Sequence, residues 1–282
     1  MPTASLDVHP PILLFLPARN ESATVADVLA AAPSSVEVDG AAFPVELLVV
    51  DDGSTDGTGD LARAAGATVI RTDGLGLGAA VRLGLGHAAT IGAAAVAFCD
   101  ADLEYDTAAL HDLVAPILDG RADYVVGSRF LGGARRMKPH RHFGNRLLTM
   151  LVRAATRDQR DVPLTDGQSG YRALSGSAAA AVDIAHDYNY AQVLTLDLLG
   201  RGFRYLEVPI DYAHREIGRS FVRLPTYLRR VVPTAYAVWR THHDPVLGAR
   251  SAILRPDRAP RTIGQSSTTK SRKRSRAARQ AA

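Results

Sequence analysis

The sequence predicts an α/β protein with a mostly parallel central sheet flanked by helices. Short apolar runs alternate with helical patterns through the first half of the 282 residues. Nearly every position within a run is apolar, which indicates strands that are covered on both faces. Loops rich in acidic residues and glycine follow several runs, as in α/β folds that bind ligands at the carboxyl ends of strands.

The first strands are marked by abrupt changes of composition. Ile12–Leu16 is wholly apolar, and valine and leucine recur at helical spacing after Ser22. The second strand, Val45–Val50, runs into residues 51–60 (DDGSTDGTGD), whose Asp, Gly and Ser favour a turn. An alanine-rich helix leads from this turn to a short strand at Thr68–Ile70.

Two further strands follow in the same rhythm. A glycine-rich loop at 74–78 opens a helix of alanine and leucine that extends to about Thr90. The apolar run Ala94–Cys99 predicts a buried strand. A helix around 107–118 then precedes the strand Tyr124–Gly127.

The pattern changes beyond Arg129. Residues 135–160 are basic, and an alanine-rich helical stretch follows the loop TDGQSGYR. A strand is expected at Tyr205–Ile210. Residues 221–239 carry apolar side chains at helical spacing, and Pro233 is expected to kink or divide this helix because proline has no amide hydrogen.

One folded domain is expected over residues 1–240, followed by a basic tail at 241–282. Residues 255–282 hold nine Lys and Arg against one Asp, a net charge of +8, which leaves −4 for residues 1–254 of a chain whose total is +4. The tail has almost no large apolar side chains, so we expect it to be disordered. Two interpretations stay open: peripheral contact with anionic lipid, or a solvated extension without a specific partner. Nucleic acid is a less favoured ligand.

Composition excludes several classes of protein. A hydrophobic fraction of 46% is that of a packed globule rather than a disordered chain. The longest uncharged apolar stretch, 83–99, is interrupted by glycines and a histidine and falls short of the ~20 apolar residues of a membrane span. The start of the chain has no secretory signal pattern, and the lone Cys99 excludes an internal disulfide. We therefore expect a cytoplasmic protein.

Three loops carry the side chains that indicate chemistry. They contain Asp51 and Asp52, the glycines at 74–78, and Asp100 and Asp102. Because the carboxyl ends of parallel strands line one crevice, we expect these loops to converge. Clustered carboxylates repel one another unless a cation neutralises them. Hard oxygen ligands favour Mg²⁺ or Mn²⁺, which also hold phosphate oxygens.

Two nucleotide-binding patterns are excluded. The segment Gly76-Leu-Gly78 lacks the third glycine of the dinucleotide fingerprint and lies outside the first βαβ unit. The pattern G-x-x-x-x-G-K-[ST] does not occur in the sequence. Neither a Rossmann dehydrogenase nor a P-loop nucleotide hydrolase is therefore expected.

Eight short segments between residues 12 and 223 share an order and spacing with a known family. They are Pro17-Ala-Arg-Asn-Glu21, DDGSTD at 51–56, Gly76-x-Gly78-Ala79, Asp100-Ala-Asp102, Gly127-Ser-Arg129, DGQSGYR at 166–172, Glu207-Val-Pro209 and Arg215-x-x-Gly218-x-Ser220. Together they resemble the inverting glycosyltransferase family 2, especially its polyprenyl-phosphate glucosyl- and mannosyltransferases. The resemblance implies a GT-A catalytic domain over residues 1–240 and a nucleotide-sugar donor, UDP-hexose or GDP-hexose.

The resemblance also implies a donor site. Its members are expected to be Pro17, Ala18, Asn20, Glu21, Asp51, Asp52, Gly76, Gly78, Asp100 and Ala101. Within this set Asp52 is expected to contact the base or ribose, with Pro17, Ala18 and Glu21 as the wall of the pocket. Asp100 and Asp102 are expected to bind the divalent metal on the diphosphate, which neutralises charge on the leaving group.

The expected acceptor is a polyprenyl phosphate. A phosphate monoester is already ionised, whereas an alcohol needs a carboxylate base, for which Asp166 is the candidate. The expected catalytic residues are Asp166, Arg129 and Arg215, and the expected acceptor-phosphate residues are Arg129, Arg141, His142 and Ser220. Arg146, Arg153, Arg157 and Arg160 are expected to form a stripe on one helix. This stripe is either a solvated helix face or a surface that attracts phosphate or lipid headgroups.

The chain departs from the family pattern at two places. Many relatives carry an acidic residue where this chain has Gln192-Val193, and a lysine where it has Phe221, so Arg219 or Arg223 is expected to supply that cation. Two rival functions stay open: transfer to a soluble acceptor, and a silent nucleotide-sugar-binding adaptor. The oligomeric state is not predicted.

Overall fold

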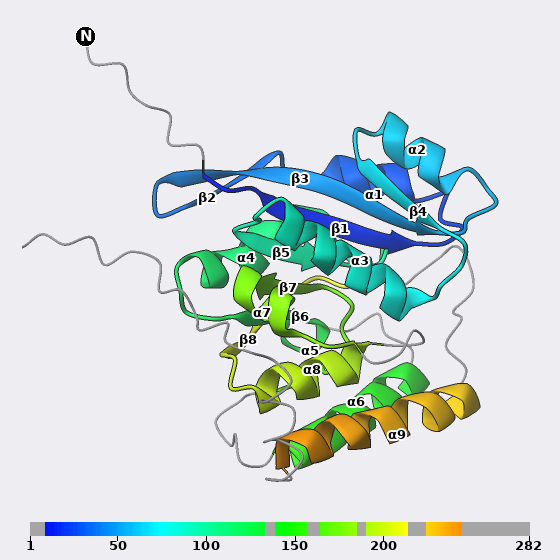
Figure 1. Cartoon of the computed structure of the whole chain (residues 1–282), viewed down its shortest axis with the longest axis vertical. Helices are drawn as coiled ribbons and strands as arrows, with labels where there is room; N and C mark the ends of the chain where they lie inside the picture. Colours follow the sequence, from blue (N-terminus) through cyan, green and yellow to red (C-terminus); the bar gives the residue numbers. More distant parts are fainter. Residues whose placement is uncertain (1–8, 133–138, 157–163, 185–189, 214–223, 244–282) are drawn as a thin grey trace, which may run out of the picture.

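The computed structural model describes residues 9–132, 139–156, 164–184, 190–213 and 224–243 (Figure 1). The strands are β1 (Ile12–Ala18), β2 (Ser35–Val38), β3 (Ala41–Asp52), β4 (Thr68–Thr72), β5 (Ala95–Phe98), β6 (Tyr124–Ser128), β7 (Arg172–Ser175) and β8 (Tyr205–Pro209). The helices are α1 (Val25–Ala31), α2 (Thr58–Ala64), α3 (Leu77–Thr90), the 3₁₀ turn η1 (Thr107–Ala109), α4 (Leu110–Leu118), α5 (Arg129–Gly132), α6 (Pro139–Ala155), α7 (Gly176–Ala181), α8 (Ala191–Gly200) and α9 (Leu224–His243).

These strands form one mixed sheet in the order β2-β3-β1-β5-β7-β6-β8, with β4 also paired to β3. The pairs β1/β3, β1/β5, β3/β4 and β6/β8 are parallel. The pairs β2/β3, β5/β7 and β6/β7 are antiparallel. The predicted α/β class with a mostly parallel sheet is therefore confirmed.

Both faces of the sheet are covered, as the unbroken apolar runs predicted. In β1, Ile12, Leu14 and Leu16 pack under α1 and α4, while Leu13 and Phe15 point to the opposite face under α3. All five side chains are fully buried. Because successive residues of a strand alternate between faces, a strand at the centre of the sheet must be apolar at every position.

All six predicted strands are present, but two others were not predicted. β2 is a short partner of β3, and β7 lies where the sequence indicated a loop followed directly by a helix. β7 is only four residues long, and its two apolar residues do not stand out from the alanines of α7. Of the two outcomes expected at Pro233, division of the helix does not occur, because α9 continues through this residue. The predicted tail and the boundary at residue 240 are not tested, since the described residues end at 243.

None of the helices in the described ranges is both long and apolar enough to cross a membrane.

Two glycines of α3 provide a test of core packing. A methyl group at Gly84 would lie 2.5 Å from ring carbons of the buried Phe15, whereas a methyl group at Gly86 would meet nothing within 4 Å. Phe15 is stacked on Phe98 and has no room to move. We expect Gly84→Ala to lower the free energy of unfolding by about 1–3 kcal/mol. Gly86→Ala should raise it by about 0.5–1 kcal/mol, because alanine favours a helix more than glycine does. Urea unfolding of the two variants measures this difference, and a change of the same sign in both would contradict the packing.

Candidate active site

The loop after β1 and the loop after β3 are joined by side-chain contacts. The amide of Asn20 donates to Ser54 Oγ at 2.9 Å, and Asn20 Oδ1 accepts from the Thr55 amide at 2.9 Å. The Glu21 amide donates to Thr58 Oγ1 at 2.9 Å. Asn20 has a φ of +56°, a left-handed conformation that asparagine tolerates better than most residues. These two loops therefore lie side by side.

Asp56 joins the same two loops from the exposed side. Its carboxylate accepts from the Ser22 amide at 3.1 Å and from the Thr58 amide at 3.1 Å. Its slight burial acts to raise the pKa, but hydrogen bonds from Thr58 and Ser22 outweigh this and lower it to about 2. The contribution of Asp56 to stability is therefore complete above the ordinary carboxyl pKa and lost as the pH falls through about 2.

Asp52 connects the second loop to the glycine-rich loop. Its carboxylate accepts from the amides of Leu75 at 2.7 Å and Gly76 at 2.9 Å, and from Thr72 Oγ1 at 2.6 Å. Only 7% of its side chain is exposed. The geometry thus gives Asp52 the role of holding the glycine-rich loop, with both oxygens occupied by donors from the protein.

Asp51 is enclosed completely. One carboxylate oxygen accepts from the Ser54 amide at 2.8 Å, and the other accepts from Arg71 at 2.8 Å. Arg71 was not predicted as a site residue. The signal for it is the strand register, which places Arg71 beside Asp51 at the ends of the parallel strands β4 and β3.

Pro17, Ala18, Gly76 and Gly78 supply backbone and shape rather than charge. Pro17 and Ala18 are the last residues of β1 and are buried. Gly76 precedes the first residue of α3 with a φ of +97°, a conformation that favours glycine, and Gly78 is buried in the first turn. The predicted donor-site residues of the first two loops therefore lie together at the carboxyl ends of β1 and β3, and Asp52 joins the glycine-rich loop to them.

The Asp100–Asp102 segment approaches this cluster at the end of β5. Thr24 Oγ1, from the loop after β1, donates to the Ala101 carbonyl at 2.6 Å. Asp102 is buried, and its Oδ1 accepts from the Glu104 amide at 3.1 Å. Leu103 between them has a φ of +62°, which costs on the order of 1–3 kcal/mol for a residue other than glycine. Such strain persists where the surrounding contacts enforce the conformation of a loop.

Asp100 faces the loop that carries Asp166. A methyl group at Gly170 would lie 2.9 Å from Asp100 Oδ2, so the absence of a side chain there lets the carboxylate approach the backbone. The Gly170 amide also donates to the Tyr105 hydroxyl at 2.7 Å. The segment 166–172 is thus part of the same site.

The carboxylates of Asp100 and Asp102 at the end of β5 fit a divalent metal ion that is also bound by a diphosphate. Within the described ranges, no group of three or more His, Cys, Asp and Glu side chains is arranged to enclose a metal ion. Mg²⁺ in nucleotide sites is usually held by one or two carboxylates, and water and phosphate oxygens complete its shell. Burial raises the pKa of the Cys99 thiol well above its usual range, and Asp100 and Asp102 raise it further, so this neighbour is no thiolate ligand. Two aspartates are therefore enough to bind a divalent ion whose other ligands are water and the phosphates of the nucleotide.

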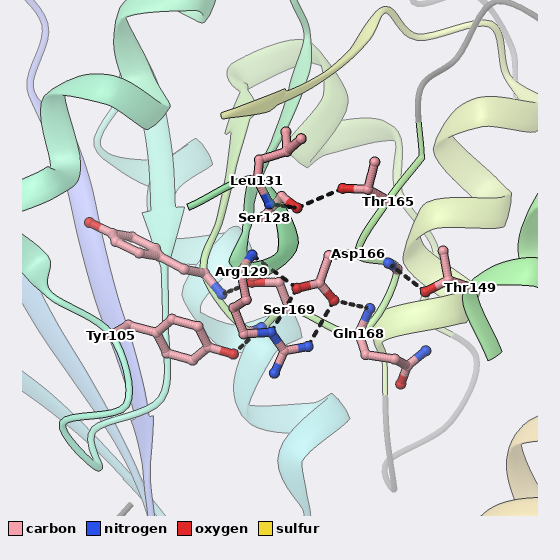
Figure 2. A network of polar contacts seen from close by, with 12 residues as sticks. Tyr105, Ser128, Arg129, Leu131, Thr149, Thr165, Asp166, Gln168 and Ser169 are labelled. Carbon is pink, nitrogen blue, oxygen red and sulfur yellow. Dashed lines mark hydrogen bonds and ion pairs between the residues drawn. The ribbon is translucent and has the colours of Figure 1, made fainter. Parts of the chain in front are cut away.

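Arg129 and Asp166 form a buried ion pair (Figure 2). Arg129 Nε donates to Asp166 Oδ2 at 2.7 Å and Nη2 to Oδ1 at 2.8 Å, and the Arg129 amide donates to Oδ2 at 3.1 Å. Asp166 is fully buried and Arg129 is 5% exposed. Burial acts to lower the pKa of Arg129, but its contacts with Tyr105 and Asp166 outweigh this and raise it, so the guanidinium stays charged.

A second carboxylate holds the backbone on which Asp166 lies. Glu207 of β8 accepts from the amides of Thr165 at 2.8 Å and Asp166 at 3.1 Å. It also accepts from the Tyr205 hydroxyl at 2.5 Å. Ser128 at the end of β6 shares a hydrogen bond of 2.7 Å with Thr165 Oγ1 (Figure 2). The segments around Ser128, Asp166 and Glu207 are thus joined by hydrogen bonds into one structural unit.

Arg172 organises the loop from inside, a role that sequence reasoning missed. Its guanidinium is completely buried and donates to the carbonyls of Gly167, Ser169 and Ala191. It also donates to the hydroxyls of Tyr124 and Thr195. The only signal in the sequence is its place in DGQSGYR, which does not distinguish a ligand-binding residue from a structural one.

The remaining predicted site residues are not tested. Arg141 and His142 belong to α6, but the structure describes only their backbone. Arg215, Ser220 and the segment 219–223 lie outside the described residues. Gln192, at the position of the expected acidic residue, is 4% exposed, and neither its amide nitrogen nor its amide oxygen has a hydrogen-bond partner.

Comparison with protein families gives the decisive observation. The model of glycosyl transferase family 2 matches residues 14–180, which include the donor loops, the Asp100–Asp102 segment and the Arg129–Asp166 pair. The chain belongs to glycosyltransferase family 2. The predicted family and the predicted glycosyltransferase activity are thereby confirmed.

Two curated relatives of this glycosyltransferase carry informative names. It is 32% identical over 188 residues to polyprenol monophosphomannose synthase of Mycolicibacterium smegmatis, a match that covers 62% of this chain and 69% of the relative. It is 30% identical over 185 residues to undecaprenyl-phosphate mannosyltransferase of Micrococcus luteus, which covers 62% of this chain and 74% of the relative. Both relatives are named for a lipid phosphate.

A solved structure of similar fold is named for a different acceptor. Glucosyl-3-phosphoglycerate synthase of Mycobacterium tuberculosis, in complex with Mn²⁺, UDP-glucose and phosphoglyceric acid, superposes with a TM-score of 0.63 and 27% sequence identity. The match covers 82% of this chain and 80% of that chain. The glycosyltransferase described here therefore has the GT-A fold, as predicted.

Proposed function

We propose that this glycosyltransferase moves a hexose, with inversion, from UDP-hexose or GDP-hexose to a polyprenyl phosphate. The observation that carries the proposal is the engagement of Asp166. Both of its oxygens are occupied by the buried Arg129, so this carboxylate is not a free base that would activate an alcohol. An acceptor that is already ionised needs no such base. The two relatives named for polyprenyl phosphates support the same acceptor class.

On the donor side, we assign Asp100 and Asp102 to Mg²⁺ or Mn²⁺ on the diphosphate. When bound, the ion neutralises negative charge on the leaving nucleoside diphosphate. The backbone at Ala101 and the loop of Pro17, Ala18, Asn20 and Glu21 shape the nucleotide pocket. Asp51 and Asp52 are proposed as positioning residues, because their carboxylates hold the loops after β3 and β4, in place of the base or ribose contact expected for Asp52. Gly76 and Gly78 let the start of α3 approach the donor.

On the acceptor side, Arg129 supplies fixed positive charge beside the reacting groups. Asp166 is a positioning residue that keeps this guanidinium oriented, in place of the base considered from the sequence. Arg141, His142, Arg215 and Ser220 remain proposed phosphate contacts. The basic tail at 241–282 is proposed to attract the enzyme to the cytoplasmic face of an anionic membrane, where a lipid acceptor is embedded.

The acceptor is tested with radiolabelled UDP-glucose, UDP-galactose and GDP-mannose, each with Mg²⁺ or Mn²⁺. Polyprenyl phosphate in detergent is offered beside water-soluble sugars and glycerol phosphates. We expect label in the organic phase with one donor and one lipid phosphate. Label that enters only water-soluble products would contradict the lipid acceptor, and donor binding with neither transfer nor hydrolysis would leave the adaptor as the better description.

A small phosphorylated metabolite is the second candidate acceptor. The observation that favours it is the structural match to an enzyme in complex with phosphoglyceric acid. Its phosphate and carboxylate suit the proposed phosphate contacts, whereas transfer to its hydroxyl would need a base other than the occupied Asp166. Phosphoglyceric acid is therefore added to the soluble acceptors of the experiment above, and transfer to it at a rate above that to polyprenyl phosphate would replace the first proposal.

A further inference from the structure

The helices α6 and α9 lie at the end of the molecule opposite α2 (Figure 1). Both pack on α8 around one small apolar cluster, to which α6 contributes Val152 and α9 contributes Ala235 and Val238. His242 near the end of α9 contacts Asp197 of α8 at 3.1 Å. One face of each helix is therefore fixed to the domain, and the opposite faces point away from it.

These outward faces carry large apolar side chains. On α6, Leu147 is 49% and Met150 63% exposed, and on α9, Val232 is 45% and Tyr236 58% exposed. Tyr236 also stacks on Trp239 with ring centroids 5.7 Å apart. In an α-helix, residues three or four positions apart share a face, so each pair forms a short apolar ridge.

Arginines flank both ridges. Arg146 and Arg153 are exposed on α6, and Arg229 and Arg240 are exposed on α9. Neither helix contains a single Asp or Glu along its sequence. Exposed apolar side chains among cations, without any acid, are the pattern of a helix that lies in the headgroup region of an anionic bilayer.

We infer that the outward faces of α6 and α9 form one docking surface for an anionic lipid bilayer. The inference rests on the proposed lipid acceptor and adds the surface that brings the active site to it. A second copy of the chain is a poorer occupant. Two such faces would bring arginines against arginines, with no acid on either helix to neutralise them.

Vesicle binding tests this surface without using catalysis. The double variant Met150→Glu with Tyr236→Glu places two negative charges on the outward faces. Its matched control is Leu61→Glu with Leu83→Glu, which makes the same change of charge at exposed leucines of α2 and α3. All proteins are full-length, so residues 255–282 are present in each and a difference reports on the two helices.

We expect the first pair to weaken co-sedimentation with vesicles of phosphatidylglycerol and phosphatidylcholine by about tenfold or more, and the control pair to change it less than about threefold. Binding to vesicles of phosphatidylcholine alone should be weak for every protein. Equal binding of both double variants overturns the proposal. So does a wild-type dimer without lipid that becomes monomeric in the Met150→Glu, Tyr236→Glu protein, because that result makes the surface a self-interface.

Transfer to a short-chain polyprenyl phosphate in detergent separates this inference from the proposed function. The Met150→Glu, Tyr236→Glu protein should keep wild-type activity there, because these residues lie outside the proposed active site. If no lipid phosphate accepts the hexose from wild-type enzyme, the proposed function fails, and the vesicle comparison still decides whether the surface binds lipid.

Discussion

Asp102→Asn is expected to lower the rate of hexose transfer by about 100-fold or more, because each charge-assisted contact at such a site contributes a few kcal/mol in the transition state. Asparagine keeps the oxygen that accepts from the Glu104 amide, so the loop should retain its conformation while the ligand charge is lost. Removal of divalent ions with EDTA should have the same effect, and added Mn²⁺ should restore the wild-type rate. Initial rates with labelled donor measure both.

Asp106→Asn is the matched control for the charge change. Asp106 lies four residues further along the same segment, is exposed, and caps the 3₁₀ turn η1 through the Ala108 amide. We expect transfer rates within about twofold of wild type, because only a surface cap is altered. Full activity of the wild-type enzyme in EDTA, or full activity of the Asp100→Ala and Asp102→Ala variants, would remove the metal assignment.

Asp166→Asn is expected to lower the free energy of unfolding by about 3–5 kcal/mol, because it leaves the buried Arg129 without its counter-charge. The exposed ion pair of Arg121 with Asp119 supplies the control. Arg121→Gln should change stability by less than about 1 kcal/mol. Urea unfolding of the two variants gives the comparison, and equal effects would show that burial of the Arg129–Asp166 pair does not matter.

A double variant separates stability from chemistry at this pair. Arg129→Met with Asp166→Leu removes both charges, and apolar replacement of a buried pair is often close to neutral for stability. Because the buried Arg129 amide also loses its acceptor, we expect this protein to unfold at a midpoint below wild type but above Asp166→Asn, and yet to transfer no hexose. A stable double variant with wild-type activity would assign the pair to the fold alone.

The sequence was sufficient for the parts of the fold that depend on periodicity. Apolar runs located β1, β3 and β5 because a strand covered on both faces has no polar positions. β7 was missed because its partners β5 and β6 are distant in the sequence, and four residues of mixed polarity carry no signal of their own. Pairing partners, not propensity, define such a strand.

The candidate site was predictable in location but not in the roles of its carboxylates. Turn composition after β3 and β5 identified Asp51, Asp52, Asp100 and Asp102. Whether an aspartate is available to a ligand depends on which protein groups donate hydrogen bonds to it. Here these groups are backbone amides and Arg71, and the sequence pattern does not show which aspartate each of them contacts. The same reason explains Asp166, whose partner Arg129 is 37 residues away.

The position of β7 between β5 and β6 has a consequence for the order in which the enzyme is assembled during its synthesis. Among the strands that the structure describes, β6 pairs with β7 and β8 alone, and both are made later. Apart from the pairing of β5 with β7, strands β1 to β5 pair within this described sheet only with one another, and all five lie within the first 98 residues. The half of the sheet that carries Arg129 has no edge to join until residues 172–175 leave the ribosome. In a growing chain, the strands of the nucleotide-binding half are therefore able to pair with one another before the central strand of the acceptor half is made, so sheet formation in the two halves is separated in time as well as along the sequence.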